Sequence, residues 1–182
     1  RKELSTFIRT KLSDLAPQQQ PVYMAGIIYA IRTQMTRRGK MAFITLDDGS
    51  GRQDVSVFSE LFDANRELLR EDQLLVVEGK VSKDDYAGGF RVVAEKLLGL
   101  AGARTRFAKS ILLKCNGGSD ANRIKDLLAP YRNGGCPVRI SYRNAGAACE
   151  LQLGEAWRVS LHDELLSSLH EQLQRENVQI VY

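Results

Sequence analysis

Between residues 22 and 98 hydrophobic and polar positions alternate in five short runs, the period of β-strands that bury one face. One helical run, with Leu61, Phe62, Leu68 and Leu69 on a single face, separates the third run from the fourth, and Ser59 precedes it as a candidate N-cap. The predicted strands cover residues 22–32, 41–47, 52–58, 73–83 and 90–98.

Two turns and one interior glycine support this assignment. Residues 36–40 reverse the chain between the first two strands, and residues 48–51 form a Gly-rich turn before the third. Gly26, inside the first strand, predicts a bulge or a coiled bend of the kind that a small barrel requires. Five strands with a helix between the third and the fourth predict an oligonucleotide-binding (OB) β-barrel at residues 21–100.

Residues 1–20 are predicted to be a lead-in segment. Apolar positions between residues 4 and 15 repeat with the period of a short helix, which Pro17 and Pro21 end. The small, basic stretch at residues 101–109 is predicted to be a linker to a second domain.

From residue 110 to residue 182 the pattern predicts a small α+β domain. Its element order is strand (110–115), helix, strand (137–143), strand (147–153), helix and strand (178–182). The order βαββαβ favours a ferredoxin-like sheet of the split βαβ type.

Composition and charge narrow the function classes. No apolar run is long enough to span a membrane, and no signal peptide is recognised, which favours a cytoplasmic protein. The net charge is only +4, and residues 1–102 carry 15 Lys and Arg against 14 Asp and Glu, so nucleic-acid binding would depend on local clusters. The three cysteines share no metal-binding spacing and are expected to be buried free thiols. The first residue is Arg1, and we expect a fragment of a longer protein.

One cluster of positive charge lies beside an aromatic strand, as single-stranded nucleic-acid binding requires. Arg37, Arg38 and Lys40 occupy the turn between the first two strands, and alternation places Phe43 opposite the core set Ala42, Ile44 and Leu46. Either Phe43 stacks on a base or it is a packing residue. The further candidates for the same groove are Arg52, Lys80, Lys83, Tyr86 and Arg91.

No pattern predicts an active site. The acid pairs at residues 47–48 and 84–85 are neighbours in turns and point apart, so turn formation explains them better than catalysis. His162 and His170 lack a third metal ligand, and neither Gly-Gly pair has the sequence of a phosphate loop.

Several segments resemble the C-terminal region of the bacterial DNA polymerase III alpha subunit. They are residues 22–28, 40–43, 46–48, 51, 55–58 and 76–82 in the barrel, and Gly154-Glu155-Ala156-Trp157-Arg158-Val159-Ser160 in the second domain. The resemblance implies a parent enzyme that extends DNA with Mg²⁺, an OB domain that handles single-stranded template, and a C-terminal domain that docks on the tau subunit of the clamp loader. The catalytic carboxylates of such a parent lie outside this chain, so the resemblance implies a non-catalytic fragment that needs no cofactor.

The resemblance also directs attention to the end of the chain. Residues 177–182 are similar to a weak clamp-binding hexapeptide of the family, although Asn177 replaces its leading Gln. Trp157, Ile180 and Tyr182 are candidate partner-binding residues, with core packing as the alternative for Trp157. Two other functions stay open: a protein-assembly module that binds no DNA, and the anticodon-binding domain of a tRNA ligase.

Overall fold

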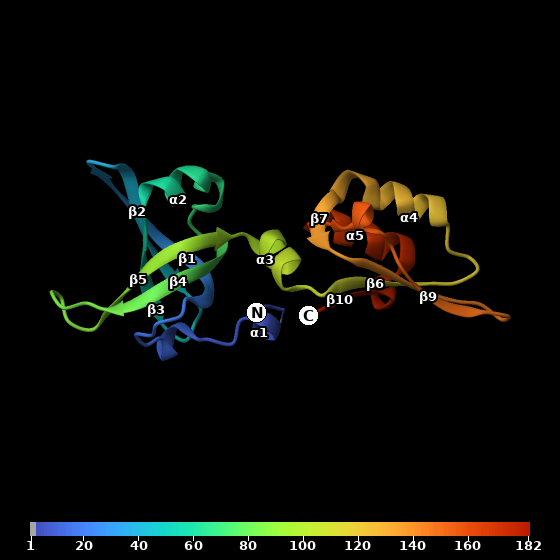
Figure 1. The fold of residues 1–182 in the computed structure, drawn as a ribbon, viewed down its shortest axis with the longest axis horizontal. Helices are drawn as coiled ribbons and strands as arrows, with labels where there is room; N and C mark the ends of the chain where they lie inside the picture. Colours follow the sequence, from blue (N-terminus) through green and yellow to red (C-terminus); the bar gives the residue numbers. More distant parts are fainter. Residues whose placement is uncertain (1–2) are drawn as a thin grey trace. The chain divides into compact units, whose positions relative to one another are not determined.

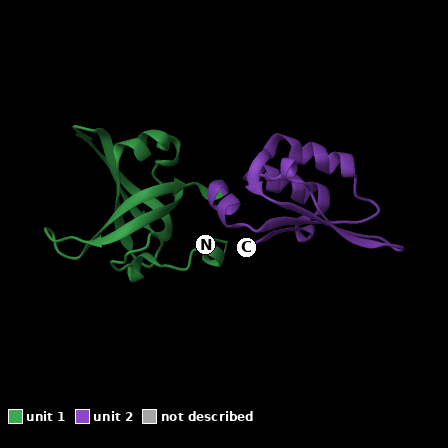
Figure 2. Ribbon diagram, viewed as in Figure 1, with its two compact units in different colours: residues 1–100 green, residues 101–182 purple. Residues whose placement is uncertain are grey.

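The computed structural model describes residues 3–182, and these form two compact units (Figure 1). Residues 1–100 make up the first unit and residues 101–182 the second (Figure 2). Each unit has its own cluster of buried apolar side chains.

The first unit is a closed five-stranded barrel with strand order β1-β2-β3-β5-β4, which confirms the predicted OB-fold. Its strands are β1 (Val22–Thr36), β2 (Gly39–Asp47), β3 (Arg52–Val57), β4 (Leu74–Lys83) and β5 (Phe90–Leu98). The predicted inward set of β2, namely Ala42, Ile44 and Leu46, is fully buried in the barrel. Strands β1 and β2 extend beyond their predicted limits, so that only two residues, Arg37 and Arg38, connect them.

A bulge interrupts the pairing of β1 with β2 between Ile28 and Ala30, not at Gly26. Gly26 has a different role, because a Cβ at this position would lie 3.0 Å from the backbone oxygen of Asp47. The bulge reverses the alternation of β1: Met24 and Ile28 face the core before it, and Ile31 packs against the core after it.

The helical segments of the first unit differ from the prediction. Helix α2 (Ser59–Ala64) starts at Ser59, and Phe58 occupies the N-cap position without a side-chain hydrogen bond, so Ser59 as the cap is wrong. The predicted lead-in helix is also wrong, since only α1 (Leu4–Phe7) and the 3-10 turn η1 (Leu12–Asp14) form. Much of this segment is extended. Ile8, Leu12 and Leu15 are buried, and the last two belong to the core of the barrel.

The second unit is a four-stranded sheet with two main helices, α4 (Ala121–Leu128) and α5 (Asp163–Leu173). The sheet order is β10-β6-β8-β9, with β6 (Ser110–Cys115), β8 (Val138–Arg143), β9 (Ala148–Gln152) and β10 (Val178–Val181). A further short strand, β7 (Arg132–Cys136), makes two isolated bridges to Val159. Helices and sheet enclose a core that includes Ile111, Leu113, Leu128, Leu165 and Leu169.

The predicted ferredoxin-like arrangement is wrong in its strand order. A split βαβ unit has another strand between its two parallel strands, whereas β6 and β8 are direct parallel neighbours. Strands β8 and β9 then form an antiparallel hairpin, and β10 pairs antiparallel with β6. The unit is therefore a simple βαβ with one strand added at each side.

The predicted linker at residues 101–109 is instead mostly helical. Helix α3 (Leu100–Phe107) buries Ala103 completely, and its buried Arg104 forms an ion pair with Asp163 at the start of α5. Thr105 Oγ1 accepts a hydrogen bond from the backbone N–H of Leu161 at 3.1 Å. These contacts make α3 a packed part of the second unit.

Among the described residues, no helix is long and apolar enough to cross a membrane. Cys115 and Cys136 are buried free thiols, as predicted, and burial raises the pKa of Cys136 to about 11. Cys149 is exposed on β9, so the prediction of a buried thiol is wrong there.

Candidate nucleic-acid interface

The outer face of β1, β2 and β3 carries a row of polar, cationic and aromatic side chains. Phe43 on β2 pairs with Arg32 on β1 and with Ser56 on β3, and it is half-buried outside the barrel core. One step further along, Thr45 donates to the Asp54 carboxylate at 2.5 Å, and Asp54 lies 3.6 Å from the Arg32 guanidinium. Because both members of the Arg32–Asp54 pair are well exposed, the pair is weak, and a phosphate can compete for the arginine.

A second aromatic group stands on the same face near the bulge. The Arg52 guanidinium carbon lies 3.6 Å from the ring centroid of Tyr29, whose side chain is exposed, and Arg52 Nε donates to Asp47 at 2.9 Å. This hydrogen bond from Arg52 holds the pKa of Asp47 below its ordinary value. Tyr29 and Arg52 therefore form a prearranged stack, held by the hydrogen bond to Asp47, that exposes both an aromatic ring and a planar cation to a base or a phosphate.

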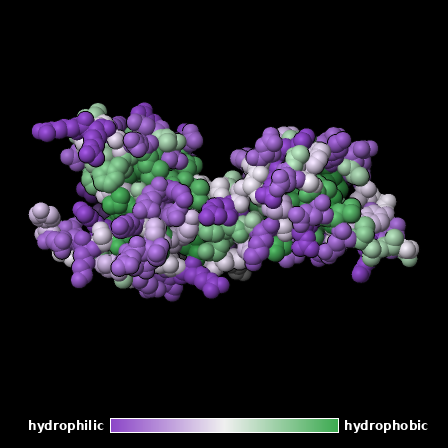
Figure 3. All heavy atoms as spheres, viewed as in Figure 1, coloured by the Kyte–Doolittle hydropathy of each residue, from purple (hydrophilic) through white to green (hydrophobic). Residues whose placement is uncertain are grey.

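The hairpin between β1 and β2 presents the strongest free positive charge. Arg37 and Arg38 are exposed, and within residues 3–182 neither guanidinium makes a hydrogen bond or an ion pair. The tip of this hairpin projects from the barrel in Figure 1 and is strongly hydrophilic in Figure 3. Lys40 does not join them, because its Nζ reaches toward helix α2 and lies 5.9 Å from the Phe62 ring centroid.

The remaining predicted groove residues belong to β4, β5 and the hairpin between them. Strand β5 continues the outer face beyond β3, because Val92 is the parallel partner of Val55 and Arg91 precedes Val92. The Nε atom of Arg91 lies 3.4 Å from Ser82 Oγ. Tyr86 is fully exposed at the tip of this hairpin, which projects from the same side of the barrel as the β1–β2 hairpin (Figure 1). Lys80 and Lys83 are exposed on β4, where Lys80 pairs with Val93.

A groove of about 910 Å³ adjoins the Tyr29 end of this face, between the lead-in segment and β1. Its lining is mixed: Arg9 and Lys11 supply positive charge, Ile8 and Ile27 supply apolar surface, and the negative charge comes from Asp47, Asp48 and Asp72. Arg9 and Lys11 can extend a phosphate path from Tyr29.

The acid pairs serve the turns, as predicted. Asp84 accepts hydrogen bonds from the backbone N–H groups of Tyr86 and Ala87, which lower its pKa. No group of three or more His, Cys, Asp or Glu among the described residues could hold a metal ion.

Asp48 fixes the lead-in segment to the barrel. Its carboxylate accepts from the Leu12 N–H at 2.9 Å, from the Ser50 N–H and hydroxyl at 2.7 and 2.6 Å, and from the Gly51 N–H at 3.2 Å. Partial burial acts to raise the pKa of Asp48, but these hydrogen bonds outweigh it and leave the pKa below its ordinary value.

Asp48→Ala is expected to reduce the free energy of unfolding of the barrel by about 1–3 kcal/mol, because it leaves several donors without an acceptor. Since the folded-state pKa is lowered, the contribution of Asp48 is present above the ordinary pKa of 3.8 and is lost as the pH falls through the lowered value. Denaturant unfolding at neutral and acidic pH measures the effect. A destabilisation that is equal at both pH values would contradict a role for the charged carboxylate.

The candidate partner-binding residues of the second unit have mainly structural surroundings. Trp157 is half-buried against the core, and the Arg132 guanidinium carbon lies 4.4 Å from its ring centroid. Ile180 is partly buried and packs against the same core. Tyr182 is half-buried, and its backbone oxygen accepts a hydrogen bond from Lys109 Nζ at 2.8 Å.

The sequence pattern did not predict Tyr29 and Arg32 as residues of the groove. Uninterrupted alternation from Val22 puts Arg32 on the inner face, and only the bulge after Ile28 brings it beside Phe43. An arginine at an inward position of a strand was the available signal, because a charged residue is almost never buried without a partner.

Two family models match the chain. The OB-fold nucleic acid binding domain matches residues 22–98, and the C-terminal domain of DNA polymerase III subunit alpha matches residues 123–173. The DNA polymerase III subunit alpha of Pseudomonas aeruginosa is 40% identical over 99% of this chain. The DNA polymerase III subunit alpha of Escherichia coli strain K12 is 32% identical over 100% of this chain. The chain spans 16% of the length of each of these curated relatives. By sequence, the chain belongs to the C-terminal region of the bacterial DNA polymerase III alpha family.

Proposed function

We propose that the outer face of β1, β2 and β3 binds single-stranded DNA. The observation that carries the proposal is that Phe43, its cross-strand neighbour Arg32 and, further along, the Tyr29–Arg52 stack share one face, next to a hairpin with two free arginines. Aromatic rings take up bases of any sequence, and arginines follow the phosphates, so the face suits sequence-tolerant binding.

The charge distribution favours moderate affinity. Arg32 and Arg52 have carboxylate partners, whereas the guanidinium groups of Arg37 and Arg38 make no ion pair within residues 3–182. DNA phosphates would therefore have to displace Asp54 from Arg32 and Asp47 from Arg52. At Arg37 and Arg38 they would bind without displacing a carboxylate. Such an interface is sensitive to salt and weak outside a larger assembly.

The proposal extends to the larger protein. Its parent is a DNA-directed DNA polymerase of the cytoplasm that uses Mg²⁺, and the present residues contribute template handling without catalysis. The second unit docks on the tau subunit of the clamp loader, with a weaker contact between residues 177–182 and the sliding clamp. The family matches support this placement, and the α+β unit offers an open sheet face and two sheet edges for a partner.

Salt-dependent titration of the full chain with labelled oligothymidylate tests the proposed DNA binding. Arg37→Ala with Arg38→Ala is expected to flatten the slope of log affinity against log salt by about 1–2, because each lost phosphate contact on single-stranded DNA counts about 0.7.

Arg123→Ala with Arg175→Ala is the matched control, since it removes the same charge from exposed positions of the second unit. Equal slopes for the wild type and both double variants would contradict the proposed role of the hairpin. Affinity without any salt dependence would favour the assembly module, and a strong preference for RNA would favour the anticodon-binding domain.

A further inference from the structure

The β8–β9 hairpin ends the sheet of the second unit with an uncovered edge. All five residues of β9 are exposed, and β9 is the terminal strand of the order β10-β6-β8-β9. In Figure 1 this hairpin, in orange, extends beyond the helices of its unit. Strand β9 contains no proline and no lysine, the residues that commonly protect such an edge.

The register shows which backbone groups this edge offers. Asn144 N–H donates to Ala147 at the turn, and Leu153 N–H donates to Val138 at the other end of the hairpin. Because hydrogen-bonded and non-hydrogen-bonded pairs alternate in an antiparallel ladder, Cys149 and Leu151 bond to β8. The N–H and C=O groups of Ala148, Glu150 and Gln152 consequently point outward, toward the space where a further strand can lie.

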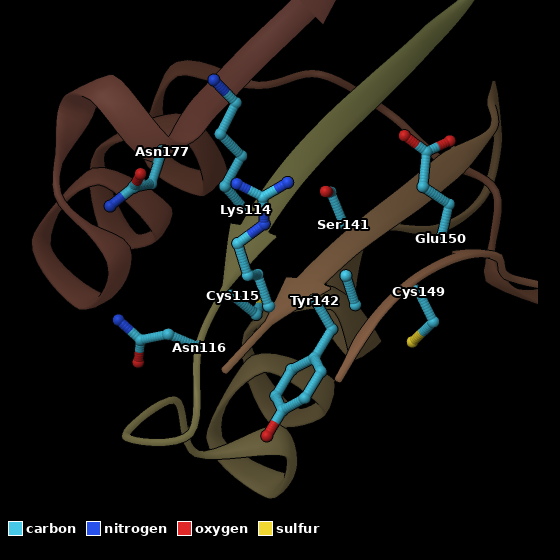
Figure 4. A pocket seen from close by; sticks show the side chains of 10 residues that line it. Lys114, Cys115, Asn116, Ser141, Tyr142, Cys149, Glu150 and Asn177 are labelled. Atoms are coloured by element: carbon cyan, nitrogen blue, oxygen red, sulfur yellow. The ribbon is translucent and has the colours of Figure 1, made fainter. Parts of the chain in front are cut away.

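The two faces of β9 differ in chemistry. On the helix side, Leu151 pairs with Ile140 of the core and yet leaves 53% of its surface exposed. On the opposite side, Lys114 and Arg143 are exposed, and within residues 3–182 neither makes an ion pair. Figure 4 shows Lys114, Ser141 and Glu150 on one side of the sheet and Tyr142 on the other.

Glu150 does not cancel this positive charge, because its carboxylate is already paired with Arg139 at 2.8 Å. Arg143 lies directly opposite Ala148, the smallest side chain of β9. An acidic side chain on an added strand can therefore reach across Ala148 to Arg143, while an apolar residue three positions along that strand covers Leu151 on the other face.

We propose that the outer edge of β9 binds an extended peptide segment of a partner protein, in which acidic and apolar residues alternate, by strand addition. The backbone groups of Ala148, Glu150 and Gln152 supply the hydrogen bonds, and Arg143, opposite Ala148, selects an acidic side chain. The inference rests on the proposed role of the second unit in protein docking and assigns the surface and the chemistry of the partner.

The test titrates the full chain with a synthetic peptide of alternating glutamate and valine, followed by NMR shifts of the backbone amides. We expect the largest shifts, and slowed amide exchange, at Ala148, Glu150 and Gln152. A peptide of alternating lysine and valine is the control and should bind at least about tenfold more weakly, because it places like charge opposite Arg143.

Two variants separate the hydrogen bonds from the charge. Gln152→Pro removes an outward N–H that the ladder does not use, and it should lower the affinity about tenfold while the sheet stays folded. Arg143→Glu should weaken the glutamate peptide and strengthen the lysine peptide, a reversal that a merely structural defect cannot produce.

Absence of shifts along β9 would overturn the proposal, as would shifts that neither variant changes. Concentration-dependent dimers that protect the same amides would replace the peptide with a second copy of this chain, and equal shifts with oligothymidylate would replace it with nucleic acid. Binding of the tau subunit to the wild type is measured separately. If the wild type binds tau and both variants bind it equally well, tau does not use the edge of β9, and only the present inference is contradicted. If the wild type binds the peptide but does not bind tau, only the proposed partner is contradicted.

Discussion

Replacing Gly134 with alanine is expected to destabilise the second unit strongly and to leave the stability of the barrel unchanged. A Cβ at Gly134 would lie 2.0 Å from the backbone carbon of Val159 and 2.1 Å from the Ser160 nitrogen. Both neighbours are backbone atoms, so no rotation of a side chain can relieve the overlap. The segment is held in place by the Gly134 N–H, which donates to the Arg158 carbonyl, and by the Ser160 N–H, which donates to the Tyr131 carbonyl.

The expected loss is at least about 3 kcal/mol of the free energy of unfolding of the second unit. Because each unit has its own core, calorimetry of the variant should show one transition at the wild-type temperature and one that is strongly lowered. Gly154→Ala is the control, since no atom lies within 4 Å of the added Cβ. Two unchanged transitions in the Gly134 variant would contradict the close approach of these two backbone segments.

Phe43→Ala is expected to lower the affinity for single-stranded DNA by about 1–3 kcal/mol, the usual contribution of one stacked base. Phe43 lies outside the barrel core, so the melting temperature of the first unit should change little. Fluorescence anisotropy with oligothymidylate, together with calorimetry, measures both quantities.

Two further variants identify stacking as the cause. Phe43→Tyr keeps an aromatic face and should retain the affinity, whereas Phe43→Leu keeps apolar volume without a π-face and should lose nearly as much as alanine. Full affinity in the leucine variant would show that the ring acts through apolar contact alone. A lowered melting temperature with unchanged affinity would make Phe43 a packing residue.

The barrel could be predicted because its strands alternate strictly enough to define an inner face. Ala42, Ile44 and Leu46 are fully buried, and Phe43 between them lies outside. The alternation fails in β1 where the bulge after Ile28 inserts one residue, and again in β5 where Glu95 is unpaired. The two groove residues that the pattern did not predict, Tyr29 and Arg32, lie at or beyond the bulge in β1.

The lead-in segment and α3 could not be predicted, because distant contacts decide their structure. Apolar spacing between residues 4 and 15 suits a helix, but Asp48, 36 residues further along, captures the Leu12 N–H and fixes the segment against the barrel. Arg104 is buried in α3, where it forms an ion pair with Asp163, 59 residues away. Short-range periodicity contains no information about either partner.

Element order also left the topology of the second unit undetermined. The order βαββαβ is compatible with a split and with a simple βαβ unit, and only the pairing of Ile111 with Val138 distinguishes them. Ile180 remains a predicted anchor, and the last strand places it partly buried against the core, a contact that strand position alone does not indicate.

Mapping oligothymidylate onto the full chain by NMR amide shifts tests the proposed interface most directly. We predict that the shifts concentrate on the outer residues of β1, β2 and β3, including Arg32, Phe43 and Arg52, and on the hairpin at Arg37 and Arg38. Saturating oligothymidylate that leaves these amides unshifted, or that shifts the second unit instead, would contradict the assignment of DNA binding to this face of the barrel.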